Sequence, residues 1–191
     1  MLPSARRARS PWSWRRPGTQ GSTSVTSRSQ DRSVDVFVEI PRGSRQKYEL
    51  DKKTGRIRLD RVLFSSVHYP ADYGFVMDTL AGDGDPLDAL VVVEEPTFPG
   101  CVLPARPIGT LLMRDEEGED EKILAVPSGD PRFDEVGDLR DLSKHWLREI
   151  ENFFATYKEL EDKRPPNISG WHGSTVAWRL IAKARARARR K

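Results

Sequence analysis

Residues 82–93 read GDGDPLDALVVV, an acidic segment that runs directly into an apolar one. Two glycines and a proline bend the first half, which predicts a tight turn that carries Asp83, Asp85 and Asp88. The β-branched run behind the turn is typical of a buried strand that would hold it in place. Carboxylate oxygens are the ligands that Mg²⁺, Mn²⁺ and Ca²⁺ prefer, so the three carboxylates could converge on a cation. A solvated acidic hairpin turn is the alternative interpretation.

The same residues exclude an EF-hand calcium loop. Asp83, Asp85 and Glu94 fall at its first, third and twelfth positions. However, Leu87 stands where a ligand belongs, and Asp88 stands where the loop needs a glycine. The segment then continues as a strand instead of a helix. The acidic turn therefore needs another explanation.

Charge is distributed unevenly along the 191 residues, although the formal net charge is only +3. Residues 1–33 hold seven Arg and one acidic residue, and residues 179–191 hold seven Lys or Arg and no acidic residue. The segment 34–178 is left with 18 basic and 28 acidic residues, a charge of about −10. We expect a disordered Arg/Ser-rich extension at 1–33, one folded domain at 34–178 and a basic tail at 179–191. The extension has the composition of a transit peptide, and a start site that is not the native one is the alternative.

The chain has one cysteine, Cys101, which excludes an internal disulfide framework and fits a reducing cytosol. No apolar run approaches the ~18 residues of a membrane span, and the N-terminus lacks the apolar region of a secretory signal. We therefore expect a cytoplasmic protein with no membrane partner.

Alternating apolar and polar residues, punctuated by Gly and Pro, predict short strands and hence a small β-barrel. The expected strands are 34–40, 47–50, 56–61, 75–77, 88–94, 101–113 and 121–126. Apolar residues at three- and four-residue spacing predict an amphipathic helix over roughly 140–160, with Asp138 or Asp141 as its cap. Ser174 is expected to cap a last helix, whose Arg-Ala end is too charged to pack.

Acidic residues and cationic or phenolic residues punctuate these strands in two sets. The acids are Glu39, Glu49, Asp83, Asp85, Asp88, Asp115 and Asp120, and the other set is Lys47, Arg61, Tyr73, Lys122, Tyr157 and Lys158. If the strand ends bring both sets to one barrel mouth, metal-binding carboxylates face a cationic rim. That combination suits phosphoryl transfer, in which metals and Lys/Arg neutralise the charge on the transferring oxygens.

The motifs that carry these residues resemble those of the soluble inorganic pyrophosphatases. The family signature Asp-[Gly/Ser]-Asp-Pro-x-Asp is met by residues 83–88. Further matches follow in family order over roughly 34–172, at 38–41, 47–49, 59–61, 69–74, 106–109, 115–122 and 153–160. The stretch 95–101 is most similar to the actinobacterial branch. The resemblance implies an α+β fold, a small OB-like β-barrel flanked by one long and one C-terminal helix.

For function, the resemblance implies hydrolysis of pyrophosphate to two orthophosphates with Mg²⁺, with Mn²⁺ or Zn²⁺ as substitutes and Ca²⁺ as an inhibitor. Asp83, Asp88 and Asp115 would hold two metals that share the attacking water. Asp120 would bind a further metal that enters with the substrate, Glu49 would help through waters, and Asp85 would be the general base. The phosphates would contact Lys47, Arg61, Lys122, Tyr157 and Lys158, and Glu39 and Tyr73 would complete the site. A homohexamer is also implied.

The chain departs from the family pattern at two places. Arg164 and Asn167 stand where the family has lysines before Gly170-Trp171, which puts one phosphate contact in question. The basic Arg-Ala run replaces a usually acidic C-terminal helix. His68 and His145 are interpreted as structural or interface residues instead of metal ligands.

Two other classes of function remain open. An OB-like barrel with basic tails could bind single-stranded nucleic acid, although the acidic core disfavours a specific nucleic-acid partner. A calcium-binding or scaffold module is disfavoured by the EF-hand mismatch and by the cations among the carboxylates.

Overall fold

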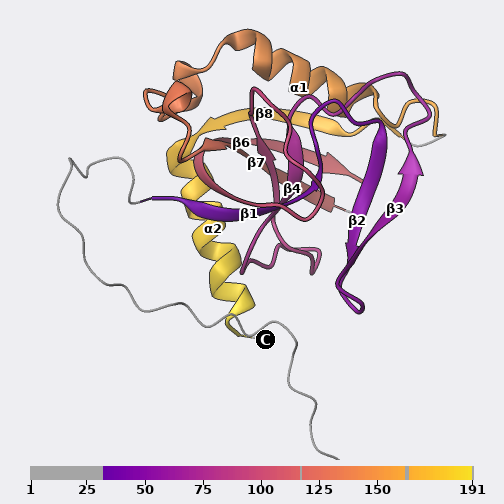
Figure 1. Cartoon of the computed structure of the whole chain (residues 1–191), viewed down its shortest axis with the longest axis horizontal. Coiled ribbons are helices and arrows are strands. Elements are labelled where there is room, and N and C mark those ends of the chain that lie inside the picture. Colours follow the sequence, from indigo (N-terminus) through magenta and orange to yellow (C-terminus); the bar gives the residue numbers. More distant parts are fainter. Residues whose placement is uncertain (1–31, 117, 162–163, 191) are drawn as a thin grey trace, which may run out of the picture.

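The computed structural model describes residues 32–116, 118–161 and 164–190 (Figure 1). Except for Arg32 and Ser33, the extension expected at 1–33 therefore lies outside the described residues. The strands are β1 (Val34–Ile40), β2 (Gln46–Asp51), β3 (Arg56–Val62), β4 (Asp72–Val76), β5 (Asp88–Val91), β6 (Val102–Asp115), β7 (Gly118–Pro127) and β8 (Asn167–Gly173). The helices are α1 (Lys144–Thr156) and α2 (Ser174–Ala188), with short 3₁₀ turns η1 (Pro131–Phe133) and η2 (Leu139–Asp141).

Five strands close into a barrel. Each is hydrogen-bonded to the next in the order β1-β4-β5-β7-β6, and β6 pairs back to β1. All of these pairs are antiparallel except β5 with β7, which is parallel. β8 extends the sheet beyond β6, and β2 and β3 form a separate hairpin at the side of the barrel (Figure 1). The small barrel with two helices confirms the predicted fold class.

Both faces of β5 and β7 are buried, which explains the continuous apolar run at 89–93. Leu90 and Leu124 belong to a core cluster that includes α1, whereas Ala89, Val91 and Ile123 belong to a second cluster with α2. Because successive residues of a strand point to opposite faces, a strand covered on both sides has no polar alternation to show.

Helix α1 is shorter than predicted, and its expected caps are wrong. Its N-cap is Ser143, whose side chain accepts a hydrogen bond from the His145 backbone N–H. Asp141 instead accepts bonds from the backbone of Gly137 and Asp138 and stabilises η2. The extended backbone of Leu142 separates the two helical segments, so the apolar period continues through a chain that is not one helix.

Helix α2 also differs at both ends from the prediction. Gly173 occupies the N-cap position, and Ser174 is the first helical residue. The first residue of the Arg-Ala end packs: Ala184 is buried with Ile181 of the preceding turn, and its carbonyl accepts a hydrogen bond of 3.1 Å from Leu80 N–H. Ala177, Ile181 and Ala184 recur at helical spacing and form the buried face of α2. The number of arginines beside this face does not reveal it.

Strand β8 was not expected from the sequence. It pairs antiparallel with β6, with a register shift between Leu112 and Met113. Gly170 has φ +113°, a backbone conformation that favours glycine and interrupts any simple alternation. Ile168 and Trp171 of β8 pack against the core cluster that contains α1.

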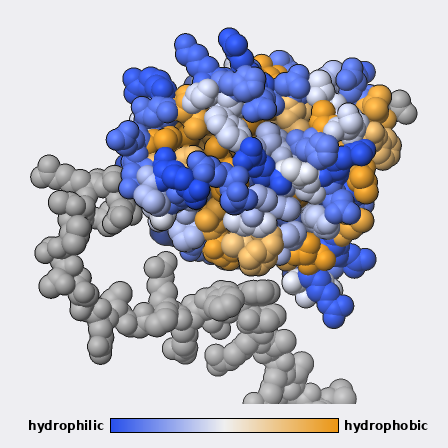
Figure 2. Space-filling model, turned by 45° about the horizontal axis from the view of Figure 1, so that its top comes forward, coloured by the Kyte–Doolittle hydropathy of each residue, from blue (hydrophilic) through white to orange (hydrophobic). Residues whose placement is uncertain are grey.

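Hydrophilic side chains cover most of the molecular face in Figure 2, with apolar areas between them. Among the described residues, no helix combines the length and the hydrophobicity that crossing a membrane requires.

Candidate active site

All of the residues predicted for the site line one pocket of about 430 Å³. The lining includes Glu39, Lys47, Glu49, Arg61, Tyr73, Asp83, Asp85, Asp88, Asp115, Asp120, Lys122, Tyr157 and Lys158. The β2–β3 hairpin forms one wall, the loop before β5 forms the mouth, β5 and β7 form the floor, and the segment after α1 forms the opposite wall. Barrel closure brings together positions that are distant in the chain.

Lys122 occupies the floor, with its side chain only 6% exposed. Its ammonium donates to Asp88, lies 2.7 Å from Asp120 Oδ1 and 3.2 Å from the Tyr73 hydroxyl. Burial lowers the pKa of Lys122, but the adjacent carboxylates of Asp88 and Asp120 more than offset this and raise it. Lys122 is therefore charged at neutral pH.

Tyr73 completes this floor. Its hydroxyl donates a 2.6 Å hydrogen bond to Asp88 Oδ2. Burial raises the pKa of Tyr73 well above its ordinary value, and the negative charge of Asp88 adds to the effect. Tyr73 keeps its proton and acts as a donor.

The two walls carry the remaining cations, each beside a carboxylate. Lys47 contacts Glu49 on the same face of β2. Lys158 Nζ lies 3.5 Å from Asp115 Oδ2, which links the segment after α1 to the end of β6. Every cation of the pocket can thus be shared between a carboxylate and an incoming anion.

The acidic loop does not aim its three carboxylates at one point. Asp83 Oδ1 accepts a 2.9 Å hydrogen bond from Asp85 N–H, which holds the turn, and Gly84 has φ +98° at its bend. Asp85 itself is 70% exposed at the pocket mouth and contacts Lys52. Asp88 lies below, against Lys122. The predicted convergence of these three residues is therefore not present in this arrangement.

Within the described ranges, no three His, Cys, Asp or Glu side chains converge closely enough to hold one cation as they stand. Lysines neutralise the carboxylates instead. Nearby positive charge does not offset the desolvation of two partly buried carboxyls: burial raises the pKa of Glu39 to about 7, and burial likewise raises the pKa of Asp120. A bound cation would favour the ionised forms of both carboxyls. The donors in the pocket are oxygens, which are the ligands that hard divalent ions prefer, so the residues present fit such an ion.

The sequence model of the inorganic pyrophosphatase family matches residues 36–189. The chain belongs to the inorganic pyrophosphatase family. The inorganic pyrophosphatase of Geobacillus stearothermophilus is 51% identical over 158 residues, which cover 83% of this chain and 95% of that protein. That of Streptomyces coelicolor is 54% identical over 143 residues, 75% of this chain and 88% of that protein.

Solved structures of the inorganic pyrophosphatase family agree with this assignment. The Helicobacter pylori inorganic pyrophosphatase superposes with a TM-score of 0.80 at 42% identity and covers 88% of this chain and 99% of that one. The family assignment is the one that the motif resemblance predicts.

Two charged residues of this pocket were not predicted from the sequence. Lys52 and Glu119 line it as well, and Lys52, in the β2–β3 turn, contacts Asp85, which is 33 positions away in the chain. Lys52 stands in a turn-forming stretch, where a lysine ordinarily indicates only a solvated surface. No sequence signal marked it.

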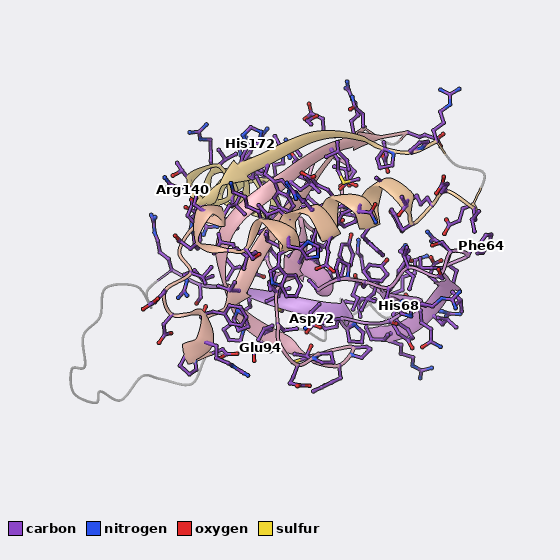
Figure 3. All side chains as sticks on the ribbon, turned by 90° about the horizontal axis from the view of Figure 1, so that it is seen from above. Phe64, His68, Asp72, Glu94, Arg140 and His172 are labelled. Carbon is purple, nitrogen blue, oxygen red and sulfur yellow. The ribbon has the colours of Figure 1, made fainter. Side chains whose placement is uncertain are left out.

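The residues at which the chain departs from the family pattern before Gly170 lie outside the pocket. Arg164 and Asn167 do not line it, and Asn167 begins β8 opposite Arg114. His68 and His145 do not line it either. His68 lies with Phe64 toward the end of the molecule that carries the β2–β3 hairpin, away from Arg140 and His172 (Figure 3).

Proposed function

We propose that this pocket hydrolyses inorganic pyrophosphate to two orthophosphates in a Mg²⁺-dependent reaction. Family membership supplies the reaction class. The observation that carries the assignment to this pocket is the joint placement, in its lining, of all the predicted carboxylates and all the predicted cationic or phenolic side chains. Carboxylates can hold metals, and the cations can bind the anion that the metals activate.

In this proposal, Asp83, Asp88 and Asp115 would hold two Mg²⁺ ions, Asp120 would bind a further ion, and Glu49 would act through water. When bound, the ions lower the pKa of the attacking water and neutralise charge on the phosphate oxygens. Glu39 lies beside this set, and its Oε1 accepts a 2.7 Å hydrogen bond from Leu50 N–H, so the orientation of its carboxyl is fixed. Mn²⁺ and Zn²⁺ would substitute, and Ca²⁺ would inhibit.

Asp85 takes the proton of the attacking water. Its side chain is exposed to the pocket mouth, while its backbone is fixed by a 2.6 Å hydrogen bond from Ala81 N–H to the Asp85 carbonyl. Among the described residues, Lys52 is the only ion-pair partner of the Asp85 carboxylate. Because the backbone is fixed, this carboxylate can accept a proton without a rearrangement of the loop.

The cationic and phenolic side chains of the pocket bind the two negatively charged phosphoryl groups. Lys122 lies in the floor, and Lys47 and Arg61 stand on the hairpin wall. Tyr157 and Lys158 face them from the segment after α1. Phosphate oxygens arriving between these walls would replace carboxylate contacts such as Lys47 to Glu49, which leaves those carboxylates available for cations.

We further propose a homohexamer that works in the cytoplasm. The family resemblance supports both, and exposed apolar side chains such as Phe98 and Val102 offer surface for subunit contacts. Light scattering coupled to size-exclusion chromatography would measure the mass; a monomer at micromolar concentration would reject the hexamer.

Orthophosphate release from pyrophosphate tests the function directly. The unaltered chain should turn over with Mg²⁺, and Asp85→Asn should lose about 10³-fold in kcat, within the usual range for a general base. Asp35→Asn, a change of the same kind at an exposed position of β1, is the control. Because Asp85→Asn keeps the other carboxylates, it should still gain thermal stability with Mg²⁺.

Two outcomes would contradict this proposal. If the folded, Mg²⁺-loaded protein releases no orthophosphate, the pocket is not a pyrophosphatase site. If Asp85→Asn is as active as Asp35→Asn, the enzyme stands and another group is the base.

A further inference from the structure

A buried ion pair joins the two walls of the pocket just behind the predicted phosphate ligands. Arg61 Nε lies 3.0 Å from Glu161 Oε1, and the two residues are 100 positions apart in the chain. The Glu161 side chain is 6% exposed, and that of Arg61 is 24% exposed. Glutamate is rarely so buried unless it is paired, so this contact fixes both side chains.

Arg61 is held at a second point as well. Its Nη1 donates a 2.7 Å hydrogen bond to Asp60 Oδ2, the carboxylate of the preceding residue. A planar guanidinium with bonds at Nε and at Nη1 cannot turn about its long axis. Its remaining N–H edge therefore keeps one direction while Arg61 lines the pocket.

Glu161 comes from the same turn that supplies two of the predicted phosphate ligands. Tyr157 and Lys158 line the pocket four and three positions before it, whereas Glu161 itself does not. The Glu161 backbone N–H donates 2.9 Å to the Lys158 carbonyl, so the anchor and the ligand share one turn. Movement of this turn would shift Lys158 and Arg61 together.

We propose that Glu161 is a positioning residue that orients the Arg61 guanidinium toward a phosphoryl group of the substrate. It acts through Arg61 and does not touch pyrophosphate. The inference rests on the proposed function for the identity of the anion. It explains why a carboxylate outside the matched motif residues is buried at the pocket wall, where an unpaired one would be costly.

The substitutions Glu161→Ala and Glu161→Gln test this role. Glu161→Ala should raise KM for pyrophosphate about tenfold and change kcat less than about threefold, because binding is weakened while the reacting groups stay in place. Glu161→Gln should give a smaller rise in KM, since its amide oxygen can still accept from Arg61 Nε. Glu159→Ala, at an exposed position of the same turn, is the matched control and should leave both constants unchanged.

A double-mutant cycle separates positioning from general support of the fold. In an Arg61→Ala background, adding Glu161→Ala should raise KM no further, because the group that Glu161 orients is already absent. If the second substitution still raises KM about tenfold, Glu161 supports the turn and not Arg61. A fall in KM for Glu161→Ala would also overturn the proposal, since it would mean that Glu161 competes with the substrate for Arg61.

Calorimetric titration with inorganic phosphate gives a readout that needs no turnover. Phosphate should bind Glu161→Ala about tenfold more weakly than the unaltered protein, and Glu159→Ala should bind it normally. If pyrophosphate is not hydrolysed but this difference is found, the proposed function fails and the role of Glu161 stands. If all three proteins bind phosphate equally, or none does, the role of Glu161 is rejected.

Discussion

Lys122 Nζ lies 2.7 Å from Asp120 Oδ1, two positions earlier on β7, and the same ammonium also contacts Asp88 on the neighbouring strand β5. One lysine therefore neutralises carboxylates from two parallel strands at the bottom of the pocket. The two carboxylates are only 32% and 25% exposed, so solvent screens their charges incompletely. The lysine and divalent cations are alternative sources of the same positive charge.

In the presence of a chelator, Lys122→Met should lower the free energy of unfolding by about 1–3 kcal/mol, because Asp88 and Asp120 lose the cation that they share. The two carboxylates are partly exposed, so this loss is smaller than for a fully buried ion pair. With Mg²⁺ present the loss should shrink, since the ion neutralises the same carboxylates. Urea denaturation in both conditions measures this, with the exposed Lys144→Met as control. An equal loss with and without Mg²⁺ would show that Lys122 and the metal act independently.

Mg²⁺ should stabilise the folded protein by about 2.7 kcal/mol at a hundred times its dissociation constant. Asp83→Asn should reduce the Mg²⁺-induced rise in Tm by more than half. Its amide oxygen can still accept from Asp85 N–H, so stability in the chelator should change by only about 0.5 kcal/mol. The exposed Asp134→Asn should respond to Mg²⁺ like the unaltered chain. A full Mg²⁺ response in Asp83→Asn would remove Asp83 from the metal ligands.

Gly74→Ala should destabilise the protein by about 3 kcal/mol, because a Cβ on residue 74 would overlap the carbonyl oxygen of Phe37 where β4 lies against β1. It should also reduce activity, since residue 74 follows Tyr73, the donor to Asp88. Chemical denaturation gives the first quantity and orthophosphate release the second. Gly129→Ala is the control, because a Cβ there would meet no atom within 4 Å. Equal stability of the two variants would mean that the β1–β4 pair can separate without cost.

Asp138 should make stability depend on pH. A hydrogen bond of 3.0 Å from Ser174 N–H, at the start of α2, holds the pKa of Asp138 below its ordinary value. Because the folded-state pKa is the lower one, its contribution is complete above the unfolded-state pKa and is lost as pH falls through the folded-state pKa.

Asp138→Asn should therefore cost about 1 kcal/mol at pH 7 and almost nothing at an acidic pH below the folded-state pKa of Asp138. Denaturation curves at the two pH values measure the difference, and Asp134→Asn should show no such change. If Asp138→Asn lowers the free energy of unfolding equally at both pH values, the effect of Asp138 comes from its packing and not from its charge.

Sequence reasoning succeeded where one face of an element is buried and the signal is local. The alternation from Val34 to Ile40 predicts β1 with its observed bounds, because shifting it by one residue would expose every valine. Motifs predict the residues that line the pocket, since the chemistry of a phosphate pocket requires particular residue types at fixed spacing.

It failed where a contact joins distant positions or a local pattern misleads. Glu161 pairs with Arg61 from 100 positions away, and nothing near Glu161 indicates a partner. β8 has a glycine at φ +113°, so it lacks the alternation by which strands are recognised. The three- and four-residue spacing of apolar residues begins in η2, before α1 starts. Residues of η2 continue the apolar face of α1, although the chain between the two segments is extended.

The Ala184 carbonyl that accepts from Leu80 N–H has a consequence for hydrogen exchange and heat inactivation. Leu80 precedes the loop that carries Asp83 and Asp85, and Ala184 stands one turn before the end of α2. Because helix ends open first, the Leu80 amide is protected only while the last turns of α2 remain wound. The lifetime of that terminal turn limits how long the loop that carries Asp85, the proposed general base, stays in place, even while the barrel is intact.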